Sequence, residues 1–400
     1  MNIAFVSYSY WPPDFGGELL LAIERLQSLA SRGHHITVLT SGRPGFPSRV
    51  HLDGMTILRS PMVHTSRPGR LLRRAVYFAW ALTHLLSHRY DAVHFGSMPG
   101  IDLASDALAA YVLAGIARRR GARTVTVHAL ADSESAALEL SGTRGFWKRL
   151  YYHNMDHIVA VSPALYAPLQ AHFPPKAVLI LNAVRDDIFV PLDDATRRRV
   201  RGELGAGDEH VVFTFLGTVC YRKGFDLLAQ AFAELAPGHP NWRLWVIGPR
   251  SHAESQNLCD EEAQEVMAPL RELDSQIIYF GRVNDRHQLA TLLGSSDVFV
   301  FPTRREGLPL SPMEAMAGGV PPIIARIPGV TDLASVEGET GLYIPPNDPK
   351  ALKQAMERLG NDPELRRQMG RKAVQRVKEA FSWEPYIDRW EQLYRDGHVF

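Results

Sequence analysis

Short apolar runs alternate with longer amphipathic segments along the 400 residues of the chain. Short runs rich in Val, Ile and Phe are typical of buried strands, whereas apolar positions three and four apart are typical of helices. In the first half we expect strands at residues 2–7, 35–40, 55–59, 91–95, 122–128, 157–161 and 177–181. The segments between them predict helices at residues 17–32, 70–87, 99–119, 146–155 and 162–172. This alternation indicates a doubly wound parallel sheet with helices on both faces.

The same alternation restarts after a polar, charged segment at residues 182–208. Strands are expected at residues 210–216, 242–248, 276–280, 297–301 and 320–325, with helices at 224–236, 261–273, 285–294 and 312–317. Polar helices follow at residues 349–359, 363–380 and 383–396. The fold class is therefore α/β, with domains at residues 1–183 and 209–380, a linker at 184–208 and a final helical segment at 381–400.

The charge is unevenly distributed, although the net charge of the whole chain is only +1. Residues 1–184 carry 18 Lys and Arg against 11 Asp and Glu, whereas residues 185–400 carry 26 against 32. This asymmetry favours an anionic surface or acceptor as a partner of the first half. The bias is too small to indicate a nucleic acid.

Cysteine content and the apolar segments bear on the compartment. Two cysteines, Cys220 and Cys259, are too few for a disulfide framework or a four-ligand zinc site, which fits a reducing compartment. No signal peptide is recognisable, and the most apolar helical stretch, residues 75–86, is shorter than the ~20 residues that span a bilayer. We expect a cytoplasmic protein. The basic, apolar helix at 70–87 leaves two interpretations open, peripheral contact with the inner face of the membrane or a core helix that covers the sheet.

The stretch from Glu306 to Glu314 follows a predicted strand and contains the breakers Gly307 and Pro309. Ser311 is the predicted N-cap of the next helix, and Glu314 stands three residues after it. A loop that ends in a helix start presents free backbone N–H groups and can bind phosphate. Glu314 then has two interpretations, as a ligand-binding carboxylate or as the carboxylate of a capping box.

Three other loops at strand ends carry candidate chemistry. Gly16 and Gly17 open a helix and can present amides to a diphosphate, or they can form a turn without a ligand. Arg222 and Lys223 can face a phosphate, or they can form a solvated basic turn. His128 can act near neutral pH or hydrogen-bond a sugar hydroxyl, or it can be purely structural. No G-x-G-x-x-G, H-E-x-x-H or D-x-D motif occurs, so we expect no dinucleotide cofactor and no metal.

Glu306 and Glu314 are separated by seven residues, and Glu-x7-Glu is the hallmark of retaining glycosyltransferases of the GT-B fold. The sequence resembles glycosyltransferase family 4 along nearly its whole length. The matching motifs are Pro-Pro-x-x-Gly16-Gly17, Thr126-Val-His128, Val161-Ser-Pro-Ala-Leu165, Leu181-Asn182-Ala-Val184, Gly217 to Gly224, Asp297-Val-Phe-Val-Phe-Pro302, Glu314-Ala-Met-Ala-Gly-Gly319, Gly329 and Gly341-Leu-Tyr-Ile-Pro-Pro346.

The resemblance implies two Rossmann-like domains that face each other across a cleft, the first on the acceptor side and the second holding a nucleotide-sugar. Residues 381–400 would cross back to the first domain. The implied activity is retaining transfer of a sugar from a nucleotide diphosphate sugar to an acceptor hydroxyl, in glycan, glycolipid or glycoconjugate synthesis. The donor is a substrate, so no cofactor is expected. An anionic or lipid-linked acceptor and an anionic membrane surface remain candidate partners.

The resemblance also implies roles for donor-binding residues. Glu314 would bind the ribose hydroxyls, and Lys223, helped by Arg222, would neutralise the leaving diphosphate. Backbone amides near Leu310 and Ser311 would contact the same diphosphate. Thr218 stands where the family often has Arg, so more of this task is expected to fall to Arg222.

The remaining roles concern the sugar and the first domain. Gly17, with Gly16, would approach the diphosphate, Glu306 would contact the transferred sugar, and His128 would bind a hydroxyl near the reacting carbon. The expected catalytic residues are therefore His128, Glu306 and Lys223. Two alternatives remain open, a nucleotide-sugar epimerase of the same fold and a non-catalytic protein that binds nucleotide-sugars.

Overall fold

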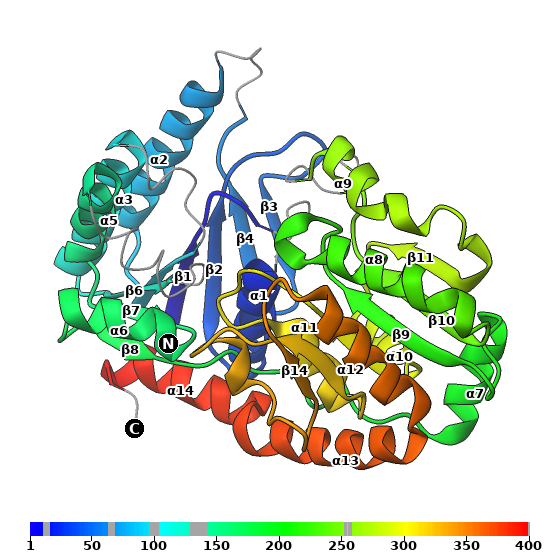
Figure 1. Cartoon of the computed structure of the whole chain (residues 1–400). Coiled ribbons are helices and arrows are strands. Elements are labelled where there is room, and N and C mark those ends of the chain that lie inside the picture. Colours follow the sequence, from blue (N-terminus) through cyan, green and yellow to red (C-terminus); the bar gives the residue numbers. More distant parts are fainter. Residues whose placement is uncertain are drawn as a thin grey trace. The chain divides into compact units, whose positions relative to one another are not determined.

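A computed structural model describes residues 1–10, 17–62, 69–96, 104–128, 142–251, 254 and 258–398. The chain forms two compact units (Figure 1). The first comprises Met1–Leu181 together with Glu384–Phe400, and the second comprises Asn182–Trp383.

The first unit contains an eight-stranded sheet in the order β3-β4-β2-β1-β5-β6-β7-β8. Its strands are β1 (Asn2–Val6), β2 (His35–Thr40), β3 (Arg49–Leu52), β4 (Met55–Arg59), β5 (Ala92–Phe95), β6 (Arg123–His128), β7 (His157–Ala160) and β8 (Ala177–Leu179). Its helices are α1 (Gly17–Ser31), α2 (Gly69–Ser87), α3 (Ala104–Arg119), α5 (Gly142–His153) and α6 (Pro163–His172). All neighbouring strands are parallel except β3 and β4, which are antiparallel.

The second unit contains a parallel sheet in the order β11-β10-β9-β12-β13-β14. Its strands are β9 (Val211–Leu216), β10 (Trp242–Ile247), β11 (Ile277–Gly281), β12 (Val298–Phe301), β13 (Pro322–Ala325) and β14 (Leu342–Ile344). Its helices are α7 (Asp194–Glu203), α8 (Phe225–Leu235), α9 (Asp260–Met267), α10 (Arg286–Gly294), α11 (Leu310–Ala317), α12 (Pro349–Asn361) and α13 (Pro363–Ala380). The predicted α/β class with two doubly wound sheets is confirmed.

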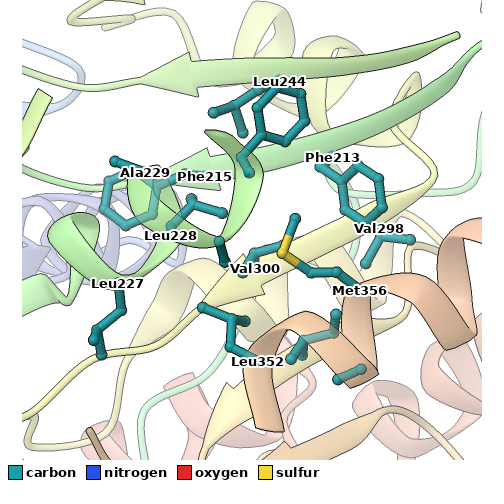
Figure 2. Packing of buried hydrophobic residues seen from close by; sticks show 14 of the residues in the cluster. Phe213, Phe215, Leu227, Leu228, Ala229, Leu244, Val298, Val300, Leu352 and Met356 are labelled. Carbon is teal, nitrogen blue, oxygen red and sulfur yellow. The ribbon is translucent and has the colours of Figure 1, made fainter. Parts of the chain in front are cut away.

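The core of the second unit lies between the sheet and the helices α8 and α12. Phe213 and Val300 of the central strands pack with Leu228 of α8 and with Leu352 and Met356 of α12 (Figure 2). All five side chains are fully buried. This packing holds β9 and β12 side by side, and the loops that follow them form the candidate site.

Residues 184–208, expected as a linker, lie within the second unit and contain α7. Asp193 caps this helix by accepting a hydrogen bond from the Thr196 N–H. Arg201 on α7 is almost completely buried, and its Nη1 lies 2.8 Å from Asp297 Oδ2. The polar segment can thus pack within the second unit, because its buried cation has a carboxylate partner that is distant in the sequence but close in space.

The last helix, α14 (Trp383–Asp396), is grouped with the first unit from Glu384 onward. The Arg25 guanidinium lies 3.8 Å from the centre of the Trp390 ring and donates to the Tyr386 hydroxyl at 3.1 Å. None of the described helices is long and apolar enough to cross a bilayer.

Candidate active site

Strand β9 lies between β10 and β12. From β9 the strands that come next in the sequence, β10 and β11, extend the sheet on one side, and the later strands, beginning with β12, extend it on the other. In open parallel sheets ligands bind at such a switch point, beyond the carboxyl ends of the strands. The loops that leave β9 and β12 contain residues 217–224 and 302–309. The strand order therefore brings Lys223 and Glu306, which are 83 residues apart in the sequence, close together.

Lys223 and Glu306 form an ion pair, with Nζ 2.6 Å from Oε1. The side chains are 16% and 8% exposed, so the pair is largely shielded from water. Thr303 Oγ1 donates to the same oxygen at 3.0 Å, and Arg222 Nη1 lies 3.5 Å from it. Within the part of the chain that the structure describes, Oε2 of Glu306 accepts no hydrogen bond. Lys223 is therefore not a solvated turn residue, and Glu306 keeps one oxygen for a ligand.

Backbone contacts join the two loops that carry this pair. Gly224 has φ +71°, and a Cβ atom there would lie 1.9 Å from the Pro302 carbonyl oxygen. The Arg304 N–H donates to the Arg222 carbonyl at 3.0 Å. The Arg304 guanidinium also binds Asp226 through two bonds of 2.6 and 2.8 Å. Glycine at 224 and the bidentate Arg304–Asp226 pair thus fix the spacing between the loops.

Helix α11 begins earlier than predicted. Its first residue is Leu310 and its N-cap is Pro309, so the prediction of Ser311 as N-cap is wrong. Proline is tolerated in the first helical turn because its missing N–H would have no intrahelical acceptor, which allows the helix to start before Pro312. The N–H groups of Leu310 and Ser311 have no acceptor among the described residues. They remain available for an anion.

Glu314 is buried and does not cap its helix. Its Oε1 accepts a hydrogen bond of 2.7 Å from Nη2 of Arg286, the first residue of α10. The Arg286 guanidinium lies 4.6 Å from the centre of the Phe189 ring. The capping-box interpretation is therefore wrong, because the carboxylate points to a neighbouring helix. Arg286 and Phe189 have no local sequence pattern that links them to Glu314, and sequence reasoning missed both.

His128 ends β6 in the first unit and is 4% exposed. Its Nδ1 lies 3.0 Å from the hydroxyl of Tyr152, a partner on α5 that the sequence did not indicate. Nε2 is buried and has no hydrogen-bond partner among the described residues. Burial, with a smaller effect of the Lys148 charge, lowers the pKa of His128 to about 4. The imidazole is therefore neutral at pH 7, and its Nε2 has no hydrogen-bond partner among the described residues.

The glycine pair is only partly described, since Gly16 lies outside the described residues. Gly17 is exposed at the first position of α1, and a Cβ atom there would meet no atom within 4 Å. Packing within the described residues therefore does not require glycine at this position. Gly17 and His128 belong to the first unit, whereas Lys223, Glu306 and Glu314 belong to the second.

Comparison with known families decides the identity. Residues 20–187 match the family model described as "Glycosyltransferase Family 4", and residues 196–376 match "Glycosyl transferases group 1". The chain belongs to glycosyltransferase family 4. The predicted family and enzyme class are therefore confirmed.

Named relatives of this glycosyltransferase are themselves glycosyltransferases. It is 25% identical over 420 residues to the D-inositol 3-phosphate glycosyltransferase of Corynebacterium diphtheriae, an alignment that covers 99% of this chain and 95% of that protein. The predicted function is confirmed at the level of glycosyl transfer, and the comparisons support neither the epimerase nor the binding-protein alternative.

Solved structures establish the GT-B fold of this glycosyltransferase. Sucrose-phosphate synthase from Thermosynechococcus elongatus superposes with a TM-score of 0.80 at 22% identity, covering 98% of each chain. HepE from Anabaena, whose structure contains UDP-glucose, superposes with a TM-score of 0.74 at 15% identity and covers 99% of each chain. At these identities, the superpositions establish the fold of the chain.

The described part of the glycosyltransferase contains no group of three or more His, Cys, Asp or Glu residues arranged to hold a metal ion. Both cysteines are free, Cys220 buried and Cys259 exposed. The expectation that catalysis needs neither a metal nor a cofactor stays a prediction. Lys223 and Arg222 are two cations that the structure places beside Glu306 at the switch point.

Proposed function

We propose that this protein is a retaining glycosyltransferase that moves a sugar from a nucleotide diphosphate sugar to an acceptor hydroxyl without a metal ion. The observation that carries the proposal is the buried Lys223–Glu306 pair at 2.6 Å, placed at the switch point of the second sheet. The UDP-glucose held by the related HepE fold supports a donor of this class.

The leaving diphosphate requires positive charge that is in place before reaction. Lys223 and Arg222 follow β9, and the unsatisfied N–H groups of Leu310 and Ser311 follow the neighbouring strand β12. Donors held in advance stabilise developing charge without reorganisation at the moment of reaction. This set can receive the diphosphate as the bond to the sugar breaks.

The sugar itself requires groups that bind hydroxyls and tolerate a cationic transition state. Glu306 offers Oε2, since its Oε1 is already taken by Lys223 and Thr303. His128 offers Nε2 of a neutral imidazole, which can bind a hydroxyl without adding positive charge. We place departure and attack on the same face of the sugar, with no covalent enzyme intermediate.

The nucleoside requires a fixed acceptor for its ribose hydroxyls. Glu314 serves this purpose because Arg286 holds its Oε1 at 2.7 Å and fixes the carboxylate. The second carboxylate oxygen then accepts from the ribose. Arg286 is in this view a positioning residue, which acts through Glu314.

The donor is tested by mixing the protein with a panel of nucleotide-sugars and measuring thermal stabilisation and slow hydrolysis. We expect one donor to stabilise the protein and to be hydrolysed, and NMR of the transfer product to show the anomeric configuration of the donor. Glu306→Gln should abolish turnover, whereas Glu339→Gln, which removes an exposed carboxylate paired with Lys372, should not. Undiminished turnover in a folded Glu306→Gln protein would sink the proposed mechanism.

For the acceptor we propose an anionic or lipid-linked molecule presented at the inner face of a membrane. On α2, Leu71 and Leu72 are 68% and 49% exposed, and the exposed Arg73 follows them. Leu108 on α3 and Phe146 on α5 are also exposed, and α3 packs against both α2 and α5. Apolar side chains beside cations suit the interface of an anionic bilayer. The relative named for D-inositol 3-phosphate supports an anionic acceptor.

Flotation with anionic liposomes at low salt tests the membrane part separately. Wild-type protein should float with the vesicles, and the double variant Leu71→Ser, Leu72→Ser should not. Val336→Ser, which changes an exposed apolar residue of the second unit, should float like wild type. No retention of wild-type protein would refute membrane contact and leave glycosyl transfer untouched.

A further inference from the structure

A second charged site lies at the amino ends of the strands of the second sheet. The donor-side loops, residues 217–224 and 302–309, follow the carboxyl ends of those strands. The second site is a cavity of about 310 Å³ lined by residues of α7, of the start of α13 and of the turns that precede β9 and β12. Those turns lead into the amino ends of the strands, whereas Lys223 and Glu306 follow the carboxyl ends. The cavity is lined by Asp194, Arg197, Arg198, Arg201, Asp208, His210, Asp297, Pro363, Arg366 and Arg367.

One carboxylate in this cavity already serves two arginines. Arg197 Nη2 lies 2.6 Å from Asp297 Oδ1, and Arg201 Nη1 lies 2.8 Å from Asp297 Oδ2. The Val212 N–H also donates to Oδ2 at 2.8 Å. Both oxygens of Asp297 are thus occupied. Its single negative charge balances only one of the two guanidinium groups of Arg197 and Arg201.

Arg366 has no carboxylate partner among the described residues. Its Nη1 donates to the carbonyls of Leu359 and Gly360, at the end of α12, at 2.6 and 2.8 Å. These bonds orient the guanidinium, and its Nε and Nη2 make no hydrogen bond among the described residues. Burial lowers the pKa of Arg366; Asp297 opposes this shift, and the arginines around the cavity add to it.

Arg198 adds another unpaired cation. It is exposed at the cavity rim and makes no ion pair within the described residues. Asp194 and Asp208 are exposed at the same rim, and Arg367 is paired with Glu364 at 2.8 Å, so the other four arginines of the lining face three aspartates. Clustered arginines repel each other unless an anion joins them, and their planar forks match phosphate oxygens.

We propose that this cavity binds a small phosphate-bearing dianion, such as a phosphate monoester, at a site distinct from the donor site. The volume suits a small molecule. Arg366 and Arg198 would bind the anion directly, which would tie α13 to α7. The bound anion would therefore stabilise the second unit. This inference does not depend on the proposed glycosyl transfer.

Inorganic phosphate is the probe for this site, measured by calorimetry and thermal shift with potassium chloride at matched ionic strength. Phosphate should bind wild-type protein and Lys223→Ala, a variant of the donor-side loop, with equal affinity. Arg366→Gln should weaken binding about tenfold or more, as expected for loss of a charge-assisted bond.

Two neighbouring arginines of α7 give a matched control that leaves the packing intact. Arg198→Gln should weaken phosphate binding, whereas Arg199→Gln, which removes a 61% exposed side chain outside the cavity lining, should not. Binding that is lost in Lys223→Ala and kept in Arg198→Gln would place phosphate at the donor loops and overturn the proposal. Absence of binding, or an equal effect of chloride, would overturn it as well.

Discussion

Replacing Glu306 with glutamine should tighten the binding of a nucleoside diphosphate while it abolishes turnover. In the unliganded protein Lys223 Nζ is held 2.6 Å from Glu306 Oε1. A bound diphosphate draws on the same ammonium group and meets the negative charge of Glu306. Glutamine keeps the size of the side chain and an acceptor oxygen, and it removes the charge that competes for Lys223.

The magnitude follows from the bond that is weakened. A hydrogen bond that involves a charged group contributes about 1.5–3 kcal/mol. In the variant the ammonium charge remains and the carboxylate charge is lost, so we expect the bond to fall from the upper to the lower end of this range. The difference of about 1–1.5 kcal/mol no longer opposes binding in the variant, which corresponds to an affinity about five- to tenfold higher. Arg222, at 3.5 Å from the carboxylate and 43% exposed, adds little to this difference.

The assay is calorimetry with the nucleoside diphosphate that stabilises wild-type protein most, followed by turnover measurements on the same preparations. Glu339→Gln serves as the control, because it removes one exposed carboxylate that is distant in the sequence from Glu306. Circular dichroism must show both variants folded. Unchanged or weaker diphosphate affinity in folded Glu306→Gln would refute the reasoning, since Glu306 would then hold the cations in place for the ligand instead of competing with it.

Three further predictions concern stability and the ribose site. Gly224→Ala should lower the free energy of unfolding, measured with urea, by about 2 kcal/mol or more, because at φ +71° the new Cβ would lie 1.9 Å from the Pro302 oxygen. Gly202→Ala should not lower it, because a Cβ atom there has no neighbour within 4 Å. The pKa of His128 is about 4 when folded against 6.5 ordinarily, so the unfolded chain takes up the proton first as the pH falls. Stability should drop by about 2 kcal/mol from pH 7 to 5, and a His128→Gln variant with the same slope would contradict this. Arg286→Gln should weaken nucleoside diphosphate binding about tenfold in calorimetry, and wild-type affinity would rule out its positioning role.

Most strands were predictable because each is a short buried run, and β2 and β4 have the expected bounds. Two strands were missed: β14, which is only three residues long, and β3, whose residues alternate between exposed and half-buried positions and lack an apolar run. It pairs with β4 through a two-residue turn in which Asp53 and Gly54 both have positive φ. An Asp-Gly pair is a strong hairpin signal, so this element could have been found from its turn.

The polar segment before β9 shows a different limit. Its three consecutive arginines suggest solvent exposure, which is why residues 184–208 were expected to be a linker. Arg201, two residues farther on, is nevertheless buried, because Asp297 and the carbonyls of Gly207 and His210 accept its hydrogen bonds. Burial of a charge depends on partners far away in the sequence, and a local pattern does not reveal them.

The same limit applied to the candidate site. Lys223, Glu306 and Glu314 could be singled out because they follow strands or begin helices, and their spacing is a family motif. Their partners could not be, because Arg286 comes from another helix, 28 residues from Glu314. The expectation that Ser311 caps its helix failed for a related reason, since proline at 312 marks a first turn without fixing its first residue.

The charges around the two carboxylates bear on how a diphosphate can be held. Lys223 and Arg222 lie next to Glu306, and Arg286 is bound to Glu314, so three cations face two anions. One surplus charge does not balance a diphosphate. The remaining stabilisation must come from dipoles, and the unsatisfied N–H groups that begin α11 lie in the same β12–α11 connection as Glu306. The Glu-x7-Glu spacing therefore does more than set two acids apart: it places a helix start between them.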